Sequence, residues 1–246
     1  MYILSIETTG KYGSVALIDS DGNITSKNSN EEMNHLKDIM FLADECLKAK
    51  GIGTNSIEAV AASIGPGSFT GIRIGVSTAR GIAEMLNIPC ISISSLEGMA
   101  ALADAHVREE VRFFAPIINA RRGQLYGALF KKSGAKYEAV LSEKQYMIDE
   151  FLEELKKIDA VEKQIIFIGD GIDAYEEEIR EAGEYRLADE DWRYQDAASV
   201  TKLALQNYES SNIISYDELL PNYMRKSEAE MRLESGTLSN KIGNLR

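Results

Sequence analysis

Residues 57–76 read IEAVAASIGPGSFTGIRIGV. The apolar run at 57–64 predicts a buried strand, and the glycine-rich turn at 65–68 leads into a helix that we expect to span 69–86. Ser68 is the natural N-cap of this helix, because its hydroxyl can accept a hydrogen bond from the first turn. A strand, a glycine-rich turn and a helix in this order predict either a loop that binds an anion through backbone N–H groups or a closely packed junction.

The flanking segments predict the remainder of an α/β lobe. We expect strands at 2–7, 14–19, 23–27 and 90–93, and helices at 31–50 and 95–105. Asp21-Gly22 between two apolar segments indicates a short hairpin. Three antiparallel strands followed by a helix, a parallel strand and another helix is the order of a ribonuclease-H-like unit.

A similar order begins again after residue 105. We expect a hairpin from 112–119 and 125–130, a strand at 164–168, and helices at 151–158 and 175–182. We interpret this as a degenerate second ribonuclease-H-like unit. The expected fold class is α/β, with a first lobe at 1–105 completed by a helix near 197–210, a second lobe at 106–196, and a tail at 221–246.

Charge and composition narrow the classes of function. The chain has 246 residues and a net charge of −12, and the segment 143–191 alone holds 17 acidic and 6 basic side chains. RNA binding by the chain on its own normally requires a basic surface, so we do not expect it. No apolar run is long enough to span a membrane, and the first residues do not resemble a signal peptide, so we expect a cytoplasmic protein.

Polar residues at the predicted strand ends form a candidate anion or nucleotide site. The first strand ends in Glu7-Thr8-Thr9-Gly10, and Gly169-Asp170-Gly171 follows the strand at 164–168. The candidate set is Glu7, Thr8, Gly65, Gly67, Ser68, Arg121 and Asp170. Ordinary turn chemistry and packing are the alternative explanation for each of these residues.

Metal and nucleophile chemistry have little support in the sequence. The two histidines, His35 and His106, lie far apart and outside the spacings that place two ligands on one helix face. Cys46 and Cys90 are too few for a disulfide framework or a Cys-rich zinc site. We therefore predict no metal site.

Two predicted helices carry a candidate partner interface. The apolar stripes of the helix at 31–50 are wide enough either to offer one side to a partner or to sink the helix into its own lobe. Small residues four apart in the helix at 69–86 allow another helix to approach closely, or they serve internal packing. The predicted interface residues are Leu36, Ile39, Met40, Ala43, Leu47, Phe69, Gly71, Ile74, Gly75 and Thr78.

Several blocks together resemble the bacterial TsaB (YeaZ) family. The blocks are 63–76, Gly81, Ile88-Pro89, 94–97, 119–126, 169–171 and 221–230. The resemblance implies an actin-like (ASKHA) two-lobed fold and a role in placing a threonylcarbamoyl group on the adenosine beside the anticodon of tRNA. It also implies that a TsaD-like paralogue performs the chemistry while this chain dimerises with it and activates it. The resemblance implies as well that a TsaE-like ATPase completes the complex and that this chain carries no catalytic residue.

The resemblance further implies a homodimer when the chain is alone, indirect contact with tRNA, and ATP or ADP only within the complex. TsaD-like enzymes carry a His-x-x-x-His metal pair where this chain has Ser95 and Met99. A hydroxyl and a thioether cannot replace two imidazoles as ligands of a catalytic metal. The alternative is an independent ATP-binding or metal-dependent enzyme, kinase-like or a metalloprotease, acting through Glu7, Thr8 and Asp170.

Overall fold

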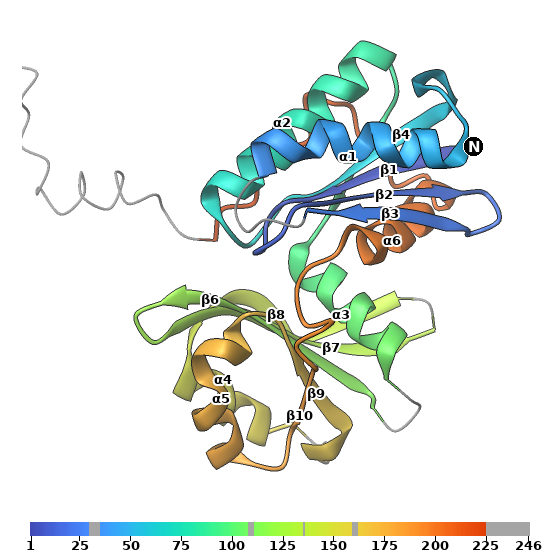
Figure 1. Cartoon of the computed structure of the whole chain (residues 1–246). Coiled ribbons are helices and arrows are strands. Elements are labelled where there is room, and N and C mark those ends of the chain that lie inside the picture. Colours follow the sequence, from blue (N-terminus) through green and yellow to red (C-terminus); the bar gives the residue numbers. More distant parts are fainter. Residues whose placement is uncertain (30–34, 108–110, 135, 159–161, 225–246) are drawn as a thin grey trace, which may run out of the picture.

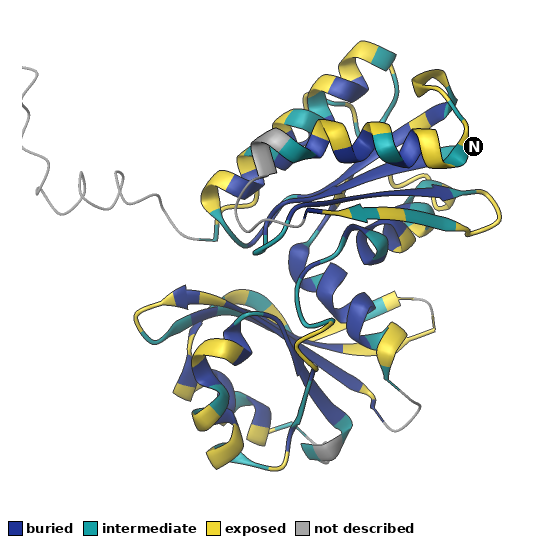
Figure 2. Cartoon of the chain, viewed as in Figure 1, coloured by how far each residue is buried: buried dark blue, intermediate teal, exposed yellow. Residues whose placement is uncertain are grey.

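The computed structural model describes residues 1–29, 35–107, 111–134, 136–158 and 162–224, apart from the side chains of 35–37 and 163. Two lobes, each built on a five-stranded sheet, lie one above the other in Figure 1. Figure 2 shows that buried residues gather on the two sheets and on the helix faces turned toward them. In the described residues, no helix is both long and apolar enough to cross a membrane.

The first sheet has the strand order β3-β2-β1-β4-β5. Its strands are β1 (Tyr2–Glu7), β2 (Ser14–Asp19), β3 (Ile24–Asn28), β4 (Ile57–Ser63) and β5 (Cys90–Ile93). β1 pairs antiparallel with β2 and parallel with β4. On one face β1 packs Leu4 and Ile6 against α1 (His35–Lys50) and α2 (Phe69–Leu86), and on the other Ile3 packs toward α6 (Ala197–Glu209). This alternation follows from the two-residue period of a strand.

The second sheet repeats this topology, with the order β10-β9-β6-β7-β8. Its strands are β6 (Phe113–Arg121), β7 (Gln124–Ser133), β8 (Lys136–Met147), β9 (Ile165–Ile168) and β10 (Arg186–Leu187). α4 (Ile148–Lys156) and α5 (Gly171–Ala182) join its core. Read from β8 to β10, the order equals that of the first sheet from β3 to β5, so the lobes are two copies of one unit.

The last helix of each unit packs mainly against the sheet of the other lobe. α3 (Ser95–His106) follows the first sheet, yet most of its buried side chains join the core of the second lobe. α6 follows the second sheet and packs against the first. The two helices meet between the sheets, where Gly98 of α3 approaches Val200 of α6. α3, which we had placed in the first lobe, therefore supplies the second.

Several elements differ from the expected ones. β8 was not predicted because it is an edge strand in which only Tyr146 is buried, so it lacks an apolar alternation. α4 and α5 begin at Ile148 and Gly171, earlier than expected. The predicted helix start at 31–34 lies outside the described residues. Ser68 caps α2 as predicted, since its Oγ accepts the N–H of Gly71 at 3.2 Å.

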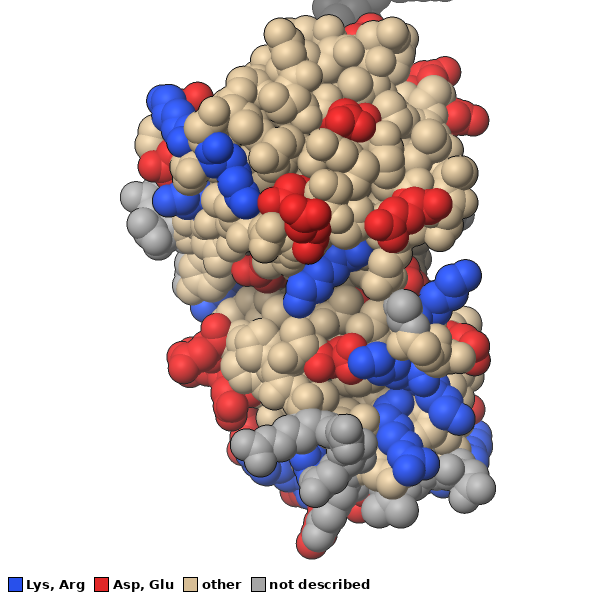
Figure 3. Space-filling view, turned by 90° about the vertical axis from the view of Figure 1, so that its right-hand side faces the viewer, with Lys and Arg blue, Asp and Glu red and all other residues tan. Residues whose placement is uncertain are grey.

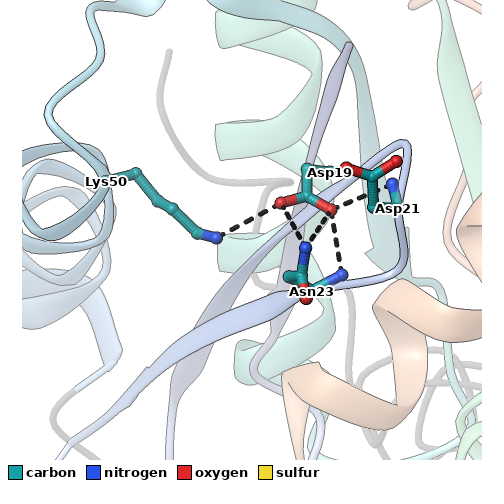
Figure 4. Close-up of polar contacts among 4 residues, drawn as sticks. All are labelled: Asp19, Asp21, Asn23 and Lys50. Atoms are coloured by element: carbon teal, nitrogen blue, oxygen red, sulfur yellow. Dashed lines mark hydrogen bonds and ion pairs between the residues drawn. The ribbon is translucent and has the colours of Figure 1, made fainter.

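The hairpin between β2 and β3 is held by one carboxylate (Figure 4). Oδ1 of Asp19 accepts hydrogen bonds from the backbone N–H groups of Asp21 and Asn23 at 3.0 and 2.9 Å. Lys50, at the end of α1, pairs with Oδ2 of Asp19 at 3.3 Å. Hydrogen bonding, first of all from the Asn23 backbone, lowers the pKa of Asp19 to about 2. A single ionised residue therefore ties the hairpin to α1.

After α6 the chain stays on the first lobe. Ile214 forms an isolated bridge with Cys90 of β5, and Leu219 is completely buried. The N–H of Asn222 donates a 2.8 Å hydrogen bond to the carbonyl oxygen of Ile64. The segment 213–224 therefore lies beside the turn that leads into α2 (Figure 1).

Candidate functional site

The end of β1 holds a buried carboxylate. Glu7 is only 1% exposed, and its Oε1 accepts hydrogen bonds from N and Oγ1 of Thr9 at 2.5 and 2.6 Å. Ser63, at the end of β4, donates its hydroxyl to the other oxygen, Oε2. Burial raises the pKa of Glu7 although these hydrogen bonds oppose the shift. Both oxygens of Glu7 are engaged within the protein.

The glycine-rich loop folds onto the same strand end. The N–H of Ser68 donates to the carbonyl oxygen of Thr9 at 2.8 Å, and Oγ1 of Thr8 donates to the carbonyl oxygen of Gly71 at 2.7 Å. A Cβ added to Gly67 would lie 2.8 Å from the Cβ of Thr9. Glycine is required at this position because the backbones approach so closely.

On the second lobe, Asp170 follows β9. Its Oδ1 accepts the N–H of Asn119 at 3.1 Å, and the Oδ1 of Asn119 accepts the N–H of Arg121 at 2.8 Å. Burial is the main cause that raises the pKa of Asp170 to about 6, and the charge of Lys11 on the first lobe opposes it. The structure therefore connects Asp170 and the backbone of Arg121 through Asn119, whereas the Arg121 side chain is exposed.

Side chains of the segment 193–195 lie between the two strand ends. Arg193 and Tyr194 hold the two oxygens of Asp173 at 2.7 and 2.8 Å. The ammonium group of Lys11 lies 5.2 Å from the ring centre of Tyr194. Gln195 is buried against Gly10, where an added Cβ would lie 2.7 Å from its Cδ. No motif marks these residues, so sequence analysis missed them.

The candidate anion residues therefore form two groups, one on each lobe. Glu7, Thr8, Gly67 and Ser68 meet at the end of β1, and the carbonyl oxygen of Gly65 accepts the N–H of Ser95 at 3.0 Å. Asp170 and Arg121 meet at Asn119 on the second lobe. The space beside Gly10 is occupied by Gln195, so the first group does not face open solvent there.

Ser95 and Met99, which stand where TsaD-like enzymes have the histidine pair, are buried in α3. Within the described ranges, no group of three or more His, Cys, Asp and Glu side chains is arranged to hold a metal ion. His106, at the end of α3, stacks on Trp192 with ring centres 4.6 Å apart and planes 3° apart. Its Nδ1 lies 2.9 Å from the carbonyl oxygen of Leu102. The imidazole is exposed at the end of the helix and stacks on Trp192 from there.

The predicted interface residues divide into buried and exposed sets. Ile39, Ala43 and Leu47 of α1 belong to the core of the first lobe, as do the buried Gly71 and Gly75 of α2, so a partner would not reach these five. The side chain of Leu36 lies outside the described part. Met40 is 56% exposed and Phe69 37%, while Ile74 and Thr78 are half-buried.

Phe41 was not predicted, yet it is 61% exposed. It lies beside Met40 on the outer side of α1, and Met85 is exposed near the end of α2. Phe41 lies outside the apolar stripes by which an amphipathic helix is identified, so the pattern did not single it out. A large aromatic side chain left in water is itself the signal that could have identified it.

Comparison with known proteins shows the family to which the chain belongs. A family model described as TsaD, tRNA N6-adenosine threonylcarbamoyltransferase, matches residues 27–233. A protein named tRNA threonylcarbamoyladenosine biosynthesis protein TsaB in Bacillus subtilis (strain 168) is 28% identical, over 94% of this chain and 97% of its own length. The chain belongs to the TsaB (YeaZ) family. The TsaB protein of Escherichia coli (strain K12) is also 28% identical, over 95% of this chain and 98% of its own.

A solved structure of YeaZ from Pseudomonas aeruginosa superposes with a TM-score of 0.76. It is 23% identical and covers 90% of this chain and 99% of its own. The predicted fold class, a two-lobed α/β architecture of the actin-like type, is confirmed. The family also accounts for the repeated sheet topology, since actin-like folds consist of two ribonuclease-H-like units.

Proposed function

We propose that this chain is a non-catalytic subunit in the biosynthesis of threonylcarbamoyladenosine in tRNA, and that it docks onto a TsaD-like paralogue and activates it. Family membership supports a role in this pathway, because the TsaB relatives carry its name. The similarity to the threonylcarbamoyltransferase model supports a partner of the same fold. The observation that carries the docking step is the exposed apolar surface of α1 and α2.

The docking face is defined here as Met40, Phe41 and Phe69, in the first half of α1 and at the start of α2. Met40 and Phe41 are more than half exposed, and Phe69 is 37% exposed. Burying one such side chain fully is worth about 1.5–3 kcal/mol, so a face with several of them favours association. α1 and α2 cover the same side of the first sheet, and a partner can contact both helices at once (Figure 1).

The hydrogen bonds of two carboxylates support a partner, and not this chain, as the protein that catalyses the reaction. Both oxygens of Glu7 are engaged with Thr9 and Ser63, and Asp173 is held by Arg193 and Tyr194. Gln195 occupies the space beside Gly10. The carboxylates of Glu7 and Asp173, whose oxygens are satisfied inside the protein, have little capacity to bind and activate a substrate.

The charge distribution supports indirect contact with tRNA. On the face shown in Figure 3, acidic and basic side chains are interspersed over both lobes. With a net charge of −12, the chain would repel a polyanion at long range. The TsaE-like ATPase, nucleotide bound only within the complex, a homodimer of the chain alone and a cytoplasmic location stay predictions.

Light scattering on a size-exclusion column tests the proposal. The full chain, mixed with the TsaD-like paralogue of the same organism, should elute as a stoichiometric heterocomplex. In a separate assay, the chain should raise the rate at which the paralogue modifies tRNA. Phe41→Glu should prevent the complex, because a charge would be buried at the interface. Met147→Glu, at an exposed methionine on β8, is the matched control and should not.

A wild-type chain that fails to associate with the paralogue, both alone and with the TsaE-like ATPase and ATP, would contradict the proposal. ATP turnover or a stoichiometric metal ion in the isolated chain would favour the independent enzyme instead. A complex that forms while tRNA modification by the paralogue is unchanged would retain docking and reject activation.

A further inference from the structure

An arginine on α2 is held by two aromatic rings at the edge of the docking face. The guanidinium carbon of Arg73 lies 4.0 Å from the ring centre of Phe69 and 5.8 Å from that of Tyr223. The Nε of Arg73 donates a 2.9 Å hydrogen bond to the hydroxyl oxygen of Tyr223. The two rings are themselves in contact, with centres 4.8 Å apart. We call these three residues the Arg73 clamp.

Tyr223 is fixed by the backbone that precedes it. The neighbouring Asn222 donates its N–H to the carbonyl oxygen of Ile64, and Leu219 is completely buried. The ring therefore stands on a segment anchored to the first lobe. An arginine stacked on one ring and hydrogen-bonded through Nε has lost most of its rotamer freedom before any ligand arrives.

Tyr223 engages only one nitrogen of the Arg73 guanidinium. No carboxylate pairs with Arg73 in the described part of the chain. The Arg73 side chain is exposed, as are Phe69 at 37% and Tyr223 at 40%. The edge formed by the two terminal nitrogens of the guanidinium matches the two oxygens of a carboxylate.

We infer that the Arg73 clamp is a receptor for a carboxylate side chain of the protein that docks on α1 and α2. The inference rests on the proposed function and names the chemistry of the partner at one point of that face. Aromatic anchors beside an arginine are the composition of protein–protein hot spots. A partner Asp or Glu would reach Arg73 at the edge of the apolar surface formed by Met40, Phe41 and Phe69.

An RNA phosphate fits this position less well. Phosphate binding draws on several cations that act together, and α2 itself holds only Arg73 and Arg80 as basic residues, while Arg225 and Lys226 lie outside the described part of the chain. The flanking groups are the aromatic rings of Phe69 and Tyr223, whereas phosphate contacts normally come from further basic and polar donors. The chemistry favours an acidic protein side chain.

Binding of the full chain to its TsaD-like paralogue, measured by titration calorimetry at low and at high salt, tests the inference. Arg73→Gln should weaken binding about tenfold at low salt and flatten its salt dependence, because a charge pair is lost. Arg73→Lys should restore part of the affinity, since it keeps the charge and not the planar fork. Tyr223→Phe should weaken binding by a smaller factor, because only the hydroxyl that orients Nε is removed.

Arg180→Gln is the matched control. It removes the same charge from an exposed arginine of α5, which pairs with Glu176 on the second lobe, and should change the affinity by less than about twofold. Circular dichroism and thermal unfolding of each variant check that the first lobe stays folded. An affinity of Arg73→Gln within about twofold of wild type at both salt concentrations would overturn the inference and leave the docking proposal intact.

Two further outcomes would also overturn the inference. Unchanged binding of Arg73→Gln to the paralogue, together with weaker binding of tRNA by the assembled pair, would overturn the carboxylate receptor and assign Arg73 to phosphate. Failure of the wild-type chain to bind the paralogue would overturn the proposed function and this inference with it.

Discussion

The hydroxyl of Thr8 donates a 2.7 Å hydrogen bond to the carbonyl oxygen of Gly71, which joins the end of β1 to the first turn of α2. The contact is possible because glycine occupies positions 71 and 75. A Cβ at either position would overlap atoms of Thr8. The glycine strip of α2 therefore serves packing within the first lobe, and the partner must be contacted by other residues of the helix.

Adding one methyl group at two glycines of α2 should have opposite effects. Gly75→Ala places its Cβ against the side chain of Thr8 and should destabilise the protein by about 1–3 kcal/mol through overpacking. At Gly81 an added Cβ meets nothing within 4 Å, so Gly81→Ala should stabilise by about 0.5–1 kcal/mol through helix propensity. Urea unfolding of both variants measures the difference. Equal effects would mean that α2 does not rest on Thr8.

Neighbouring residues of α1 should separate folding from docking. Ile39 is 1% exposed in the core, so Ile39→Ala should cost about 2–4 kcal/mol of unfolding free energy. Phe41→Ala should change stability by no more than about 0.5 kcal/mol but weaken binding to the paralogue. Denaturant melts and a binding titration give the two quantities. A stability loss at Phe41 as large as that at Ile39 would show that Phe41 is a core residue.

Asp170 should make the protein less stable as the pH rises from acid. Its pKa is raised from 3.8 to about 6, so between these values the unfolded chain releases a proton that the folded chain keeps. Stability therefore falls across this window and is level above it. Asp170→Asn should remove this decline and gain about 2–3 kcal/mol at neutral pH, provided that its amide oxygen still accepts the N–H of Asn119.

Unfolding of wild type and Asp170→Asn at several pH values between about 4 and about 7 gives the difference curve. Parallel curves for wild type and Asp170→Asn would contradict the raised pKa.

Asp19 should act with the opposite sign at the acid end. Its folded pKa of about 2 lies below the ordinary value of 3.8, so the ionised form is favoured by folding. The stability it contributes is complete above the unfolded pKa and is lost as the pH falls through about 2. Asp19→Asn should destabilise the protein at neutral pH and reduce the loss of stability in acid. The acid unfolding transition of both proteins is measured by far-ultraviolet circular dichroism as the pH is lowered. Coincident transitions would count against a lowered pKa of Asp19.

Much of the architecture could be predicted because it depends on local pattern. The strands 2–7, 14–19 and 90–93 and the helix 69–86 have the predicted bounds. Buried strands read as apolar runs, and the helix has a cap and a glycine-rich entry. β8 could not be predicted in this way, since an edge strand with most side chains in water carries no apolar alternation.

The candidate site could be predicted only in part. The residues at the ends of β1 and β9 were identified from their types and positions, because polar residues after buried strands stand out. Arg193, Tyr194 and Gln195 were not, since their importance comes from the crossing of the chain between the lobes. Likewise, Tyr223 meets Phe69 and Arg73 across 150 residues of sequence, and no local pattern records such a contact.

By itself the sequence determined the α/β class, the repeated unit, the Ser68 cap and the family. These depend on periodicity, turn chemistry and motif spacing, all of which are local. Only the tertiary structure decided which apolar stripe of α1 faces the core, that Gly71 and Gly75 face Thr8, and that Phe41 faces outward. A helix with apolar residues on more than one side has no preferred orientation of its own, and burial is assigned by the sheet that packs against it.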